Sequence, residues 1–215
     1  MKILIFFTFC FLTACSARLT GDKKNALKRE LENMVEIDQV AAYIPQGRYK
    51  SYSKEEWNRF KDSVFTSHKV RVEKIFNRYG FPGFDEVGKD GSNHFWLLVQ
   101  HSDQYPAFQK RVLKAMDKEV KKGNASASNY AYLYDRVEVN AGQKQLFGTQ
   151  VTYEVNRTGR AIPKNGLIDS VSVDNRRKEY GLEPLVEYLN TMTTMHYDMN
   201  RERYEQMGVK SPDLY

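Results

Sequence analysis

The two cysteines of this chain, Cys10 and Cys15, both lie within its first 15 residues, so the rest of the chain contains no thiol. A disulfide and a cysteine nucleophile are therefore excluded for the body of the protein. A body of about 200 residues can bury enough apolar surface to fold without such crosslinks. The sequence accordingly predicts a single domain that is stabilised by its core alone.

The N-terminal segment has the layout of a signal peptide, with Lys2 followed by an apolar run from Ile3 to Leu12 and then by small residues. The run is about half as long as the roughly 20 apolar residues that span a bilayer. The string LTAC, which ends at Cys15, resembles the lipobox of bacterial lipoproteins. In a lipobox the signal peptide is removed and the cysteine, now the first residue, is lipidated.

We therefore expect residues 1–14 to be a signal peptide, Cys15 to carry a lipid anchor and residues 15–25 to form a tether. Several acyl chains on one residue give stable attachment to a membrane. Because Ser16 and not an aspartate follows the cysteine, we expect the protein to be anchored in the bacterial cell envelope, at the outer membrane and facing the periplasm. The alternative is an ordinary secretory signal that is cut near Ala14, with Cys15 as an incidental thiol.

The charge of the chain is mildly basic, +6 at neutral pH. Its basic residues are spread over the sequence, with small clusters only at 121–122 and 176–178. Nucleic-acid-binding proteins instead gather such residues in a patch or stripe. We therefore expect no nucleic-acid partner, and the excess charge suits a solvated surface or weak attraction to anionic lipid headgroups.

The spacing of apolar residues predicts mostly helices. The surest helix begins with Ser53 and Glu56, the pattern of a capping box, and keeps helical spacing as far as Tyr79. After a glycine-rich loop at 87–91, Ser92 caps a helix that is apolar over most of its circumference. Such a helix belongs at the centre of a fold.

A segment with the composition of β-strands follows the first helices. Residues 145–155 are rich in β-branched and aromatic side chains, and a turn signal at 156–159 predicts a small β-hairpin. We expect a mainly α fold, a single helical domain over residues 26–200 with about six helices and one small β-hairpin near 145–163. A polar tail, 201–215, follows it.

Four separated strings, LLVQHSD, YLYDRV, QLFGTQ and DNRRKEYGLEPLVEY, resemble a bacterial family known as Domain of Unknown Function 6624 and occur in the order of that family. The resemblance runs from about Asp38 to Tyr188. The turn at 80–83 resembles the Gly-Trp-Pro-Gly turn of the family with Phe81 in place of the tryptophan, and the pair Asp38-Gln39 also matches. The arginine that the family pattern has shortly after this pair is absent, since Ala42 stands there. The family implies no established activity.

The central helix carries a polar face. On a helical wheel Asn93, His94, Gln100, His101 and Gln104 gather within about a third of the circumference. Buried polar groups without partners cost about 1–3 kcal/mol each. These side chains therefore either bond to other groups of the protein or line a wet pocket.

The same four strings contain side chains that could act on a ligand, or bind it, in such a pocket. His101 is the candidate catalytic residue, with Asp103 or Asp135 as its catalytic partner, because a histidine beside a carboxylate can transfer protons near neutral pH. The candidate ligand-binding residues, which we expect to converge on His101, are Gln100, Arg136, Gln145, Thr149, Gln150, Asp174 and Arg177. Two guanidinium groups among several amides suit a small anionic or hydroxyl-rich ligand.

This interpretation describes an envelope lipoprotein with a polar cleft, and the histidine would make it a hydrolase. No cofactor and no metal are expected, because the sequence has neither a His-Glu-x-x-His motif nor a cysteine pair.

The alternative is a non-catalytic interaction or structural module whose partner is an envelope protein. Asp135-Arg136 and Asp174 with Arg177 would then be ion pairs between helices, while Gln145 and Gln150 would tie the hairpin to the helices. His68 lies on the core stripe of its helix and is interpreted as a core histidine. His196 is expected at the surface.

Overall fold

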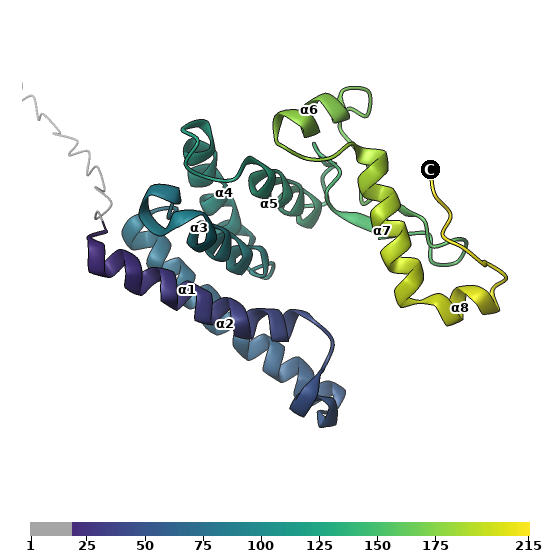
Figure 1. Ribbon diagram of the computed structural model, residues 1–215, viewed down its shortest axis with the longest axis horizontal. Coiled ribbons are helices and arrows are strands. Elements are labelled where there is room, and N and C mark those ends of the chain that lie inside the picture. The colour runs from purple at the N-terminus through teal and green to yellow at the C-terminus, as the bar shows by residue number, and fades with distance from the viewer. Residues whose placement is uncertain (1–18) are drawn as a thin grey trace, which may run out of the picture.

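The computed structural model describes residues 19–215, so the expected signal peptide and Cys15 lie outside the described residues. The described chain forms two parts that meet at α5 (Figure 1). The first part contains α1 (Gly21–Ala42), the 3-10 helix η1 (Gly47–Ser51), α2 (Lys54–Tyr79), α3 (Phe84–Gln100), α4 (Pro106–Lys121) and α5 (Ala127–Asn140). The second part contains β1 (Val151–Tyr153), β2 (Ala161–Pro163), α6 (Val173–Glu179), α7 (Leu185–Met199) and α8 (Arg201–Gln206).

The predicted mainly α fold with one small β-hairpin is confirmed. The expected number of about six helices was too low, because residues 19–215 form eight α-helices. The short helix expected to run from Asp174 to Gly181 is α6, whereas α8, with six residues, lies in the segment expected as a polar tail and is too short to show a clear apolar period. No helix in the described part of the chain is long and apolar enough to cross a bilayer.

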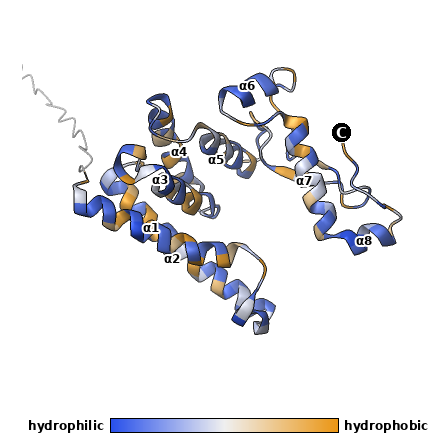
Figure 2. Ribbon diagram, viewed as in Figure 1, coloured by the Kyte–Doolittle hydropathy of each residue, from blue (hydrophilic) through white to orange (hydrophobic). Residues whose placement is uncertain are grey.

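The core of the first part is formed by the apolar stripes of five helices. α1 packs on both α2 and α3, while α3 also contacts α4 and α5. Figure 2 shows hydrophobic and hydrophilic residues alternating in bands along α1 and α2, as amphipathic helices require. Fully buried side chains at the centre include Leu31, Phe95, Val112 and Leu133. The prediction that the helix around Phe95 lies centrally is confirmed.

The ends of α3 differ from the expectation. The helix begins at Phe84 and includes the segment predicted as a loop at 87–91, with a kink at Gly88, whose φ of 71° is not helical. It ends at Gln100, and His101 is its C-cap. The helical wheel therefore extended too far, and Gln104 does not share a helical face with His94. The turn that follows moves His101 off the regular helix.

The second part is built around α7 and the hairpin. β1 and β2 pair antiparallel, with Val151 opposite Pro163 and Tyr153 opposite Ala161. α7 packs on both strands and contributes Leu189 to a small core. α8 and the chain end, expected as a polar tail, pack against this part, since the hydroxyl of Tyr215 donates to the carbonyl oxygen of Ala161 at 2.9 Å.

Candidate functional site

Three titratable side chains meet where α1, α2 and the end of α3 come together. Asp38 on α1 is fully buried, at 0% exposure. Its Oδ1 lies 3.3 Å from Nδ1 of His68 on α2, and its Oδ2 is hydrogen-bonded to Nδ1 of His101. Two histidine rings from different elements thus share one carboxylate, with one oxygen for each ring.

The helices place these residues by their apolar stripes. Asp38 lies on the buried face of α1 with Leu31 and Ala41, and His68 lies between the buried residues Val64 and Val72 on α2. A charged residue at such a position must find a partner, because an unpaired buried charge is costly. The prediction that His68 is a core histidine is confirmed, and its partner is Asp38.

The protonation of the cluster follows from its geometry. Burial by itself would raise the pKa of Asp38, but hydrogen bonds from His101 and His68 outweigh it, so the pKa lies below the usual value of 3.8. An ionised carboxylate only accepts hydrogen bonds, so each histidine donates from Nδ1. Nε2 of a neutral ring is then a proton acceptor, and neither Nε2 has a hydrogen-bond partner among residues 19–215.

His101 lines a pocket of about 260 Å³ between α2 and the turn that joins α3 to α4. Its side chain is 21% exposed, and its ring lies 5.4 Å from that of Phe65. α2 contributes Lys61, Asp62, Phe65 and Thr66 to the wall, and the turn contributes His101, Asp103, Gln104 and Tyr105. The pocket therefore combines a histidine, a lysine cation, two carboxylates, hydroxyl groups and aromatic rings.

Asp103 holds the turn in place and does not pair with His101. Its Oδ2 accepts from Nη1 of Arg136 at 2.7 Å, and its Oδ1 accepts from Asn140 at 3.0 Å and from Gln109 at 3.2 Å. Arg136 also donates to the carbonyl oxygen of Gln100 at 3.1 Å. The end of α3 is thereby tied to α4 and α5, and this network fixes the position of His101.

Asp135, the other expected partner of His101, organises a loop. Its buried carboxylate accepts the backbone N–H groups of Leu146, Phe147 and Thr149 at 2.8, 3.1 and 2.9 Å, and the hydroxyl of Thr149 at 3.0 Å. Burial raises the pKa of Asp135 more than these donors lower it. The loop at 146–149 is thus shaped around one carboxylate.

Gln145 and Gln150 close the same loop. Gln145 donates to the carbonyl oxygens of Gln150 at 2.7 Å and Lys164 at 2.6 Å, and it accepts the N–H of Gln150 at 2.8 Å. These bonds join the loop to the residue that follows β2. The alternative had both glutamines tying the hairpin to the helices, but Gln145 instead bonds backbone groups on either side of the hairpin, and Gln150 takes part through its backbone.

Arg177 and Asp174 lie on α6 beside that loop. Arg177 is fully buried and donates to the carbonyl oxygens of Phe147 at 2.7 Å and Glu183 at 2.6 Å. Asp174 is exposed and accepts the N–H of Leu185 at the start of α7, at 2.7 Å. The two side chains do not form an ion pair with each other.

The candidate residues therefore fall into two groups. His101 and Asp103 line the 260 Å³ pocket, and Gln100 and Arg136 adjoin it through Asp103. The residues around the 146–149 loop do not line this pocket: they are Asp135, Gln145, Thr149, Gln150, Asp174 and Arg177. The expected convergence of the other candidates on His101 does not occur.

The sequence interpretation missed Asp38 and Lys61 as members of the site. The signal for Asp38 was a carboxylate on an apolar helical stripe, at a position that also matched the family pattern. Lys61 had no such signal, because lysines are common on exposed helical faces.

The remaining histidines lie elsewhere. His196, expected at the surface, is half-buried: its ring is stacked on Tyr153 at 3.8 Å and bonds to the hydroxyl of Tyr204 at 2.9 Å. Burial and then the charge of Arg203 lower the pKa of His196. Within residues 19–215 no group of three His, Cys, Asp or Glu side chains is arranged to hold a metal ion.

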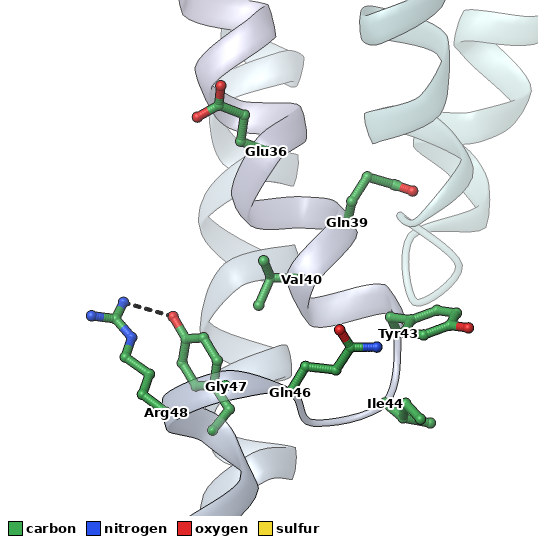
Figure 3. Close-up of a pocket in the computed structure, with 9 residues that line it drawn as sticks. Glu36, Gln39, Val40, Tyr43, Ile44, Gln46, Gly47 and Arg48 are labelled. Carbon is green, nitrogen blue, oxygen red and sulfur yellow. Dashed lines mark hydrogen bonds between the residues drawn. The ribbon is translucent and has the colours of Figure 1, made fainter.

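A larger pocket of about 600 Å³ lies at the C-terminal end of α1, where Gln39 and Val40 follow Asp38 in the sequence. Figure 3 shows Gln39, Val40 and Tyr43 on the last turns of α1 and Ile44 and Gln46 on the loop that leads to η1. Tyr43 and Ile44 are 65% and 67% exposed. This pocket is lined mainly by apolar and uncharged atoms and contains no histidine.

The comparisons with known proteins identify the family but no activity. No curated protein and no solved structure matches the chain. The model of a family of unknown function, DUF6624, matches residues 25–199, which include all four strings and Asp38. The chain therefore belongs to the DUF6624 family.

Proposed function

We propose that this protein is a hydrolase in which His101 is the general base and Asp38 orients it. The observation that carries the proposal is the hydrogen bond between the fully buried carboxylate of Asp38 and Nδ1 of His101, beside a pocket. The bond fixes the tautomer in which Nε2 can take a proton. An acid–base group held in this way contributes about 10²–10⁴-fold to a reaction rate.

The proposed step uses water as the nucleophile. Nε2 of His101 takes a proton from a water molecule as its oxygen forms a bond to the substrate's electrophilic atom. The imidazolium, stabilised by Asp38, then returns that proton to the leaving group as its bond breaks. No electron transfer or further reactant is needed.

The pocket wall suggests the class of substrate. The wall carries the ammonium group of Lys61 and the carboxylate of Asp62, neither of which forms an ion pair within residues 19–215. Lys61 can stabilise an anionic group or a developing oxyanion. Asp103 is already neutralised by Arg136. A volume of about 260 Å³ suits a small molecule. We therefore propose a small anionic or hydroxyl-rich ester or phosphoester as the substrate.

Chromogenic substrates test this function. The purified protein is assayed with p-nitrophenyl acetate, p-nitrophenyl phosphate and bis-p-nitrophenyl phosphate at neutral pH, beside His101→Asn. The asparagine amide keeps a donor for Asp38 but removes the base. We expect His101→Asn to lose activity by about 10²–10⁴-fold while keeping its melting temperature.

A matched control is His94→Gln, which removes a histidine of α3 that does not line the pocket. It should retain wild-type activity. Equal turnover by the wild type and His101→Asn, or no turnover of any of the three probes, would count against the proposal.

A second candidate function, an interaction module, is favoured by the exposure of Tyr43 and Ile44 beside the 600 Å³ pocket. Aromatic side chains with adjacent apolar surface are typical of protein contacts. In-cell photocrosslinking from position 44 tests it. A discrete crosslinked envelope protein that disappears in Tyr43→Ser would favour this module, and an uncrosslinked protein would oppose it.

We also propose that the protein is a lipoprotein anchored through Cys15 to the envelope, as the LTAC string indicates. Labelled palmitate should be incorporated by the wild-type protein and not by Cys15→Ala. Incorporation that survives the substitution would refute the anchor.

A further inference from the structure

We propose that His68 is a positioning residue for His101, and that it acts by holding the shared carboxylate of Asp38. The proposal rests on the function inferred above for His101, but its structural part can be tested without any substrate. His68 lies 33 positions before His101 in the sequence and on another helix, so the carboxylate is the only group hydrogen-bonded to both rings among residues 19–215.

The two oxygens of the Asp38 carboxylate have different partners. Oδ1 of Asp38 is bonded to His68 alone, while Oδ2 is bonded to His101 and also accepts from Nε2 of Gln39 at 3.5 Å. The Asp38 side chain is 1% exposed, so bulk water does not reach either oxygen. If the donor at His68 is removed, Oδ1 therefore loses its hydrogen bond in a buried place.

Loss of this hydrogen bond would change the carboxylate itself. A buried acceptor without a donor is costly, and the carboxyl group can escape this cost by rotating or by taking up a proton. Either response weakens its ability to accept from Nδ1 of His101. The ring of His101 is then free to place its proton on Nε2, the atom that must stay unprotonated to act as a base.

His68 does not line the 260 Å³ pocket. It lines a separate pocket of about 460 Å³ with Arg29, Asn33 and Met34. A substitution at His68 therefore leaves the wall beside His101 in place, and any effect on His101 passes through Asp38.

The experiment compares His68→Asn with His68→Leu. The asparagine keeps an amide donor near the place of Nδ1, whereas leucine has similar bulk and no donor. Nitrogen-15 NMR of the histidine rings, recorded near pH 8.5, reports which ring nitrogen of His101 carries the proton. The signals of His101 are assigned by their loss in His101→Asn.

We expect the wild type and His68→Asn to show His101 protonated on Nδ1 alone. In His68→Leu we expect the downfield Nδ1 proton signal to be lost and Nε2 to become partly protonated. On the chromogenic probes His68→Leu should lose about 10–100-fold in activity, as when an outer residue that orients a functional group is removed. His68→Asn should restore most of it.

The two proposals fail in different ways. An unchanged His101 tautomer in a folded His68→Leu protein overturns the positioning role, whatever the activity. A changed tautomer together with no turnover of the probes supports the positioning role and removes the hydrolase. If His68→Leu does not fold, His68→Ala is measured in the same way, and an unchanged tautomer there has the same meaning.

Discussion

Asp135 and Arg177 hold the backbone of Phe147 from both sides. The carboxylate of Asp135 accepts the N–H of Phe147 at 3.1 Å, and the guanidinium of Arg177 donates to its carbonyl oxygen at 2.7 Å. Both charged side chains are fully buried. They do not form an ion pair with each other, and each is hydrogen-bonded to the backbone of Phe147 instead. The loop at 146–149 thereby joins α5 to α6.

The first prediction concerns this loop. Asp135→Ala leaves three backbone N–H groups without their acceptor, and buried unsatisfied groups cost about 1–3 kcal/mol each, less than additively. We expect the free energy of unfolding to fall by about 2–4 kcal/mol in urea denaturation. The matched control, Asp174→Ala, removes a single exposed acceptor and should cost about 1 kcal/mol or less. Similar losses in the two variants would contradict the organising role of Asp135.

A second prediction concerns acid stability. The pKa of Asp38 is lower in the folded protein than its unfolded value of 3.8, so its contribution to stability is present above pH 3.8 and is lost as the pH falls through the folded pKa. We expect Asp38→Asn to be less stable than the wild type at about pH 5, and the difference to narrow as the pH falls below the unfolded value. Urea denaturation at each pH measures it. A difference that widens in acid would refute the assigned direction.

The third prediction concerns the second part of the fold. The pKa of His196 is lowered in the folded state, so the unfolded chain binds a proton first as the pH falls below the usual value of 6.5. The folded protein should therefore lose stability over this interval, while His196→Gln lacks that loss. Thermal denaturation from about pH 7.5 to 5 should show the gap between wild type and variant shrinking. A constant gap would show that His196 does not titrate differently on folding.

A fourth prediction tests the packing of α8. Gly159 has a φ of 74°, and a Cβ there would lie 2.5 Å from the ring of the buried Tyr204. Gly159→Ala combines backbone strain with overpacking and should destabilise by about 2–4 kcal/mol. Gly142 has a similar φ of 76° with no atom within 4 Å of its Cβ position. Gly142→Ala should therefore lose only the free energy of the backbone strain, about 1–2 kcal/mol. Equal losses of stability in the two variants would count against the close contact between residue 159 and Tyr204.

Local patterns predicted the elements better than the site. The capping box of Ser53 and Glu56 is confirmed with both of its hydrogen bonds, because all its atoms lie within four consecutive residues. The hairpin was likewise visible from its turn residues. The kink at Gly88 and the end of α3 were not, because the glycine-rich segment indicated a loop over 87–91, whereas the backbone departs from helical geometry at Gly88 and is helical on both sides of it.

The pairing of Asp38 with His101 joins residues 63 positions apart, and no spacing rule covers such a distance. Because Asp103 lies two residues after His101, the sequence suggested Asp103 as the partner of His101. In the fold, the carboxylate of Asp103 accepts hydrogen bonds from Arg136 and Asn140 instead. In the folded protein His101 therefore pairs with Asp38 on α1. The sequence shows Asp38 only as a charged residue within an apolar stripe.

The position of Asp38 on α1 has a mechanical consequence. α1 begins at Gly21 and contains 22 residues, a length of about 33 Å at 1.5 Å per residue. Tension applied to the chain before Gly21 reaches this helix first and is resisted by its packing on α2 and α3. A pull strong enough to peel α1 away would withdraw the carboxylate and leave both histidines behind, so the pocket beside His101 would respond to load on the N-terminal end of the chain.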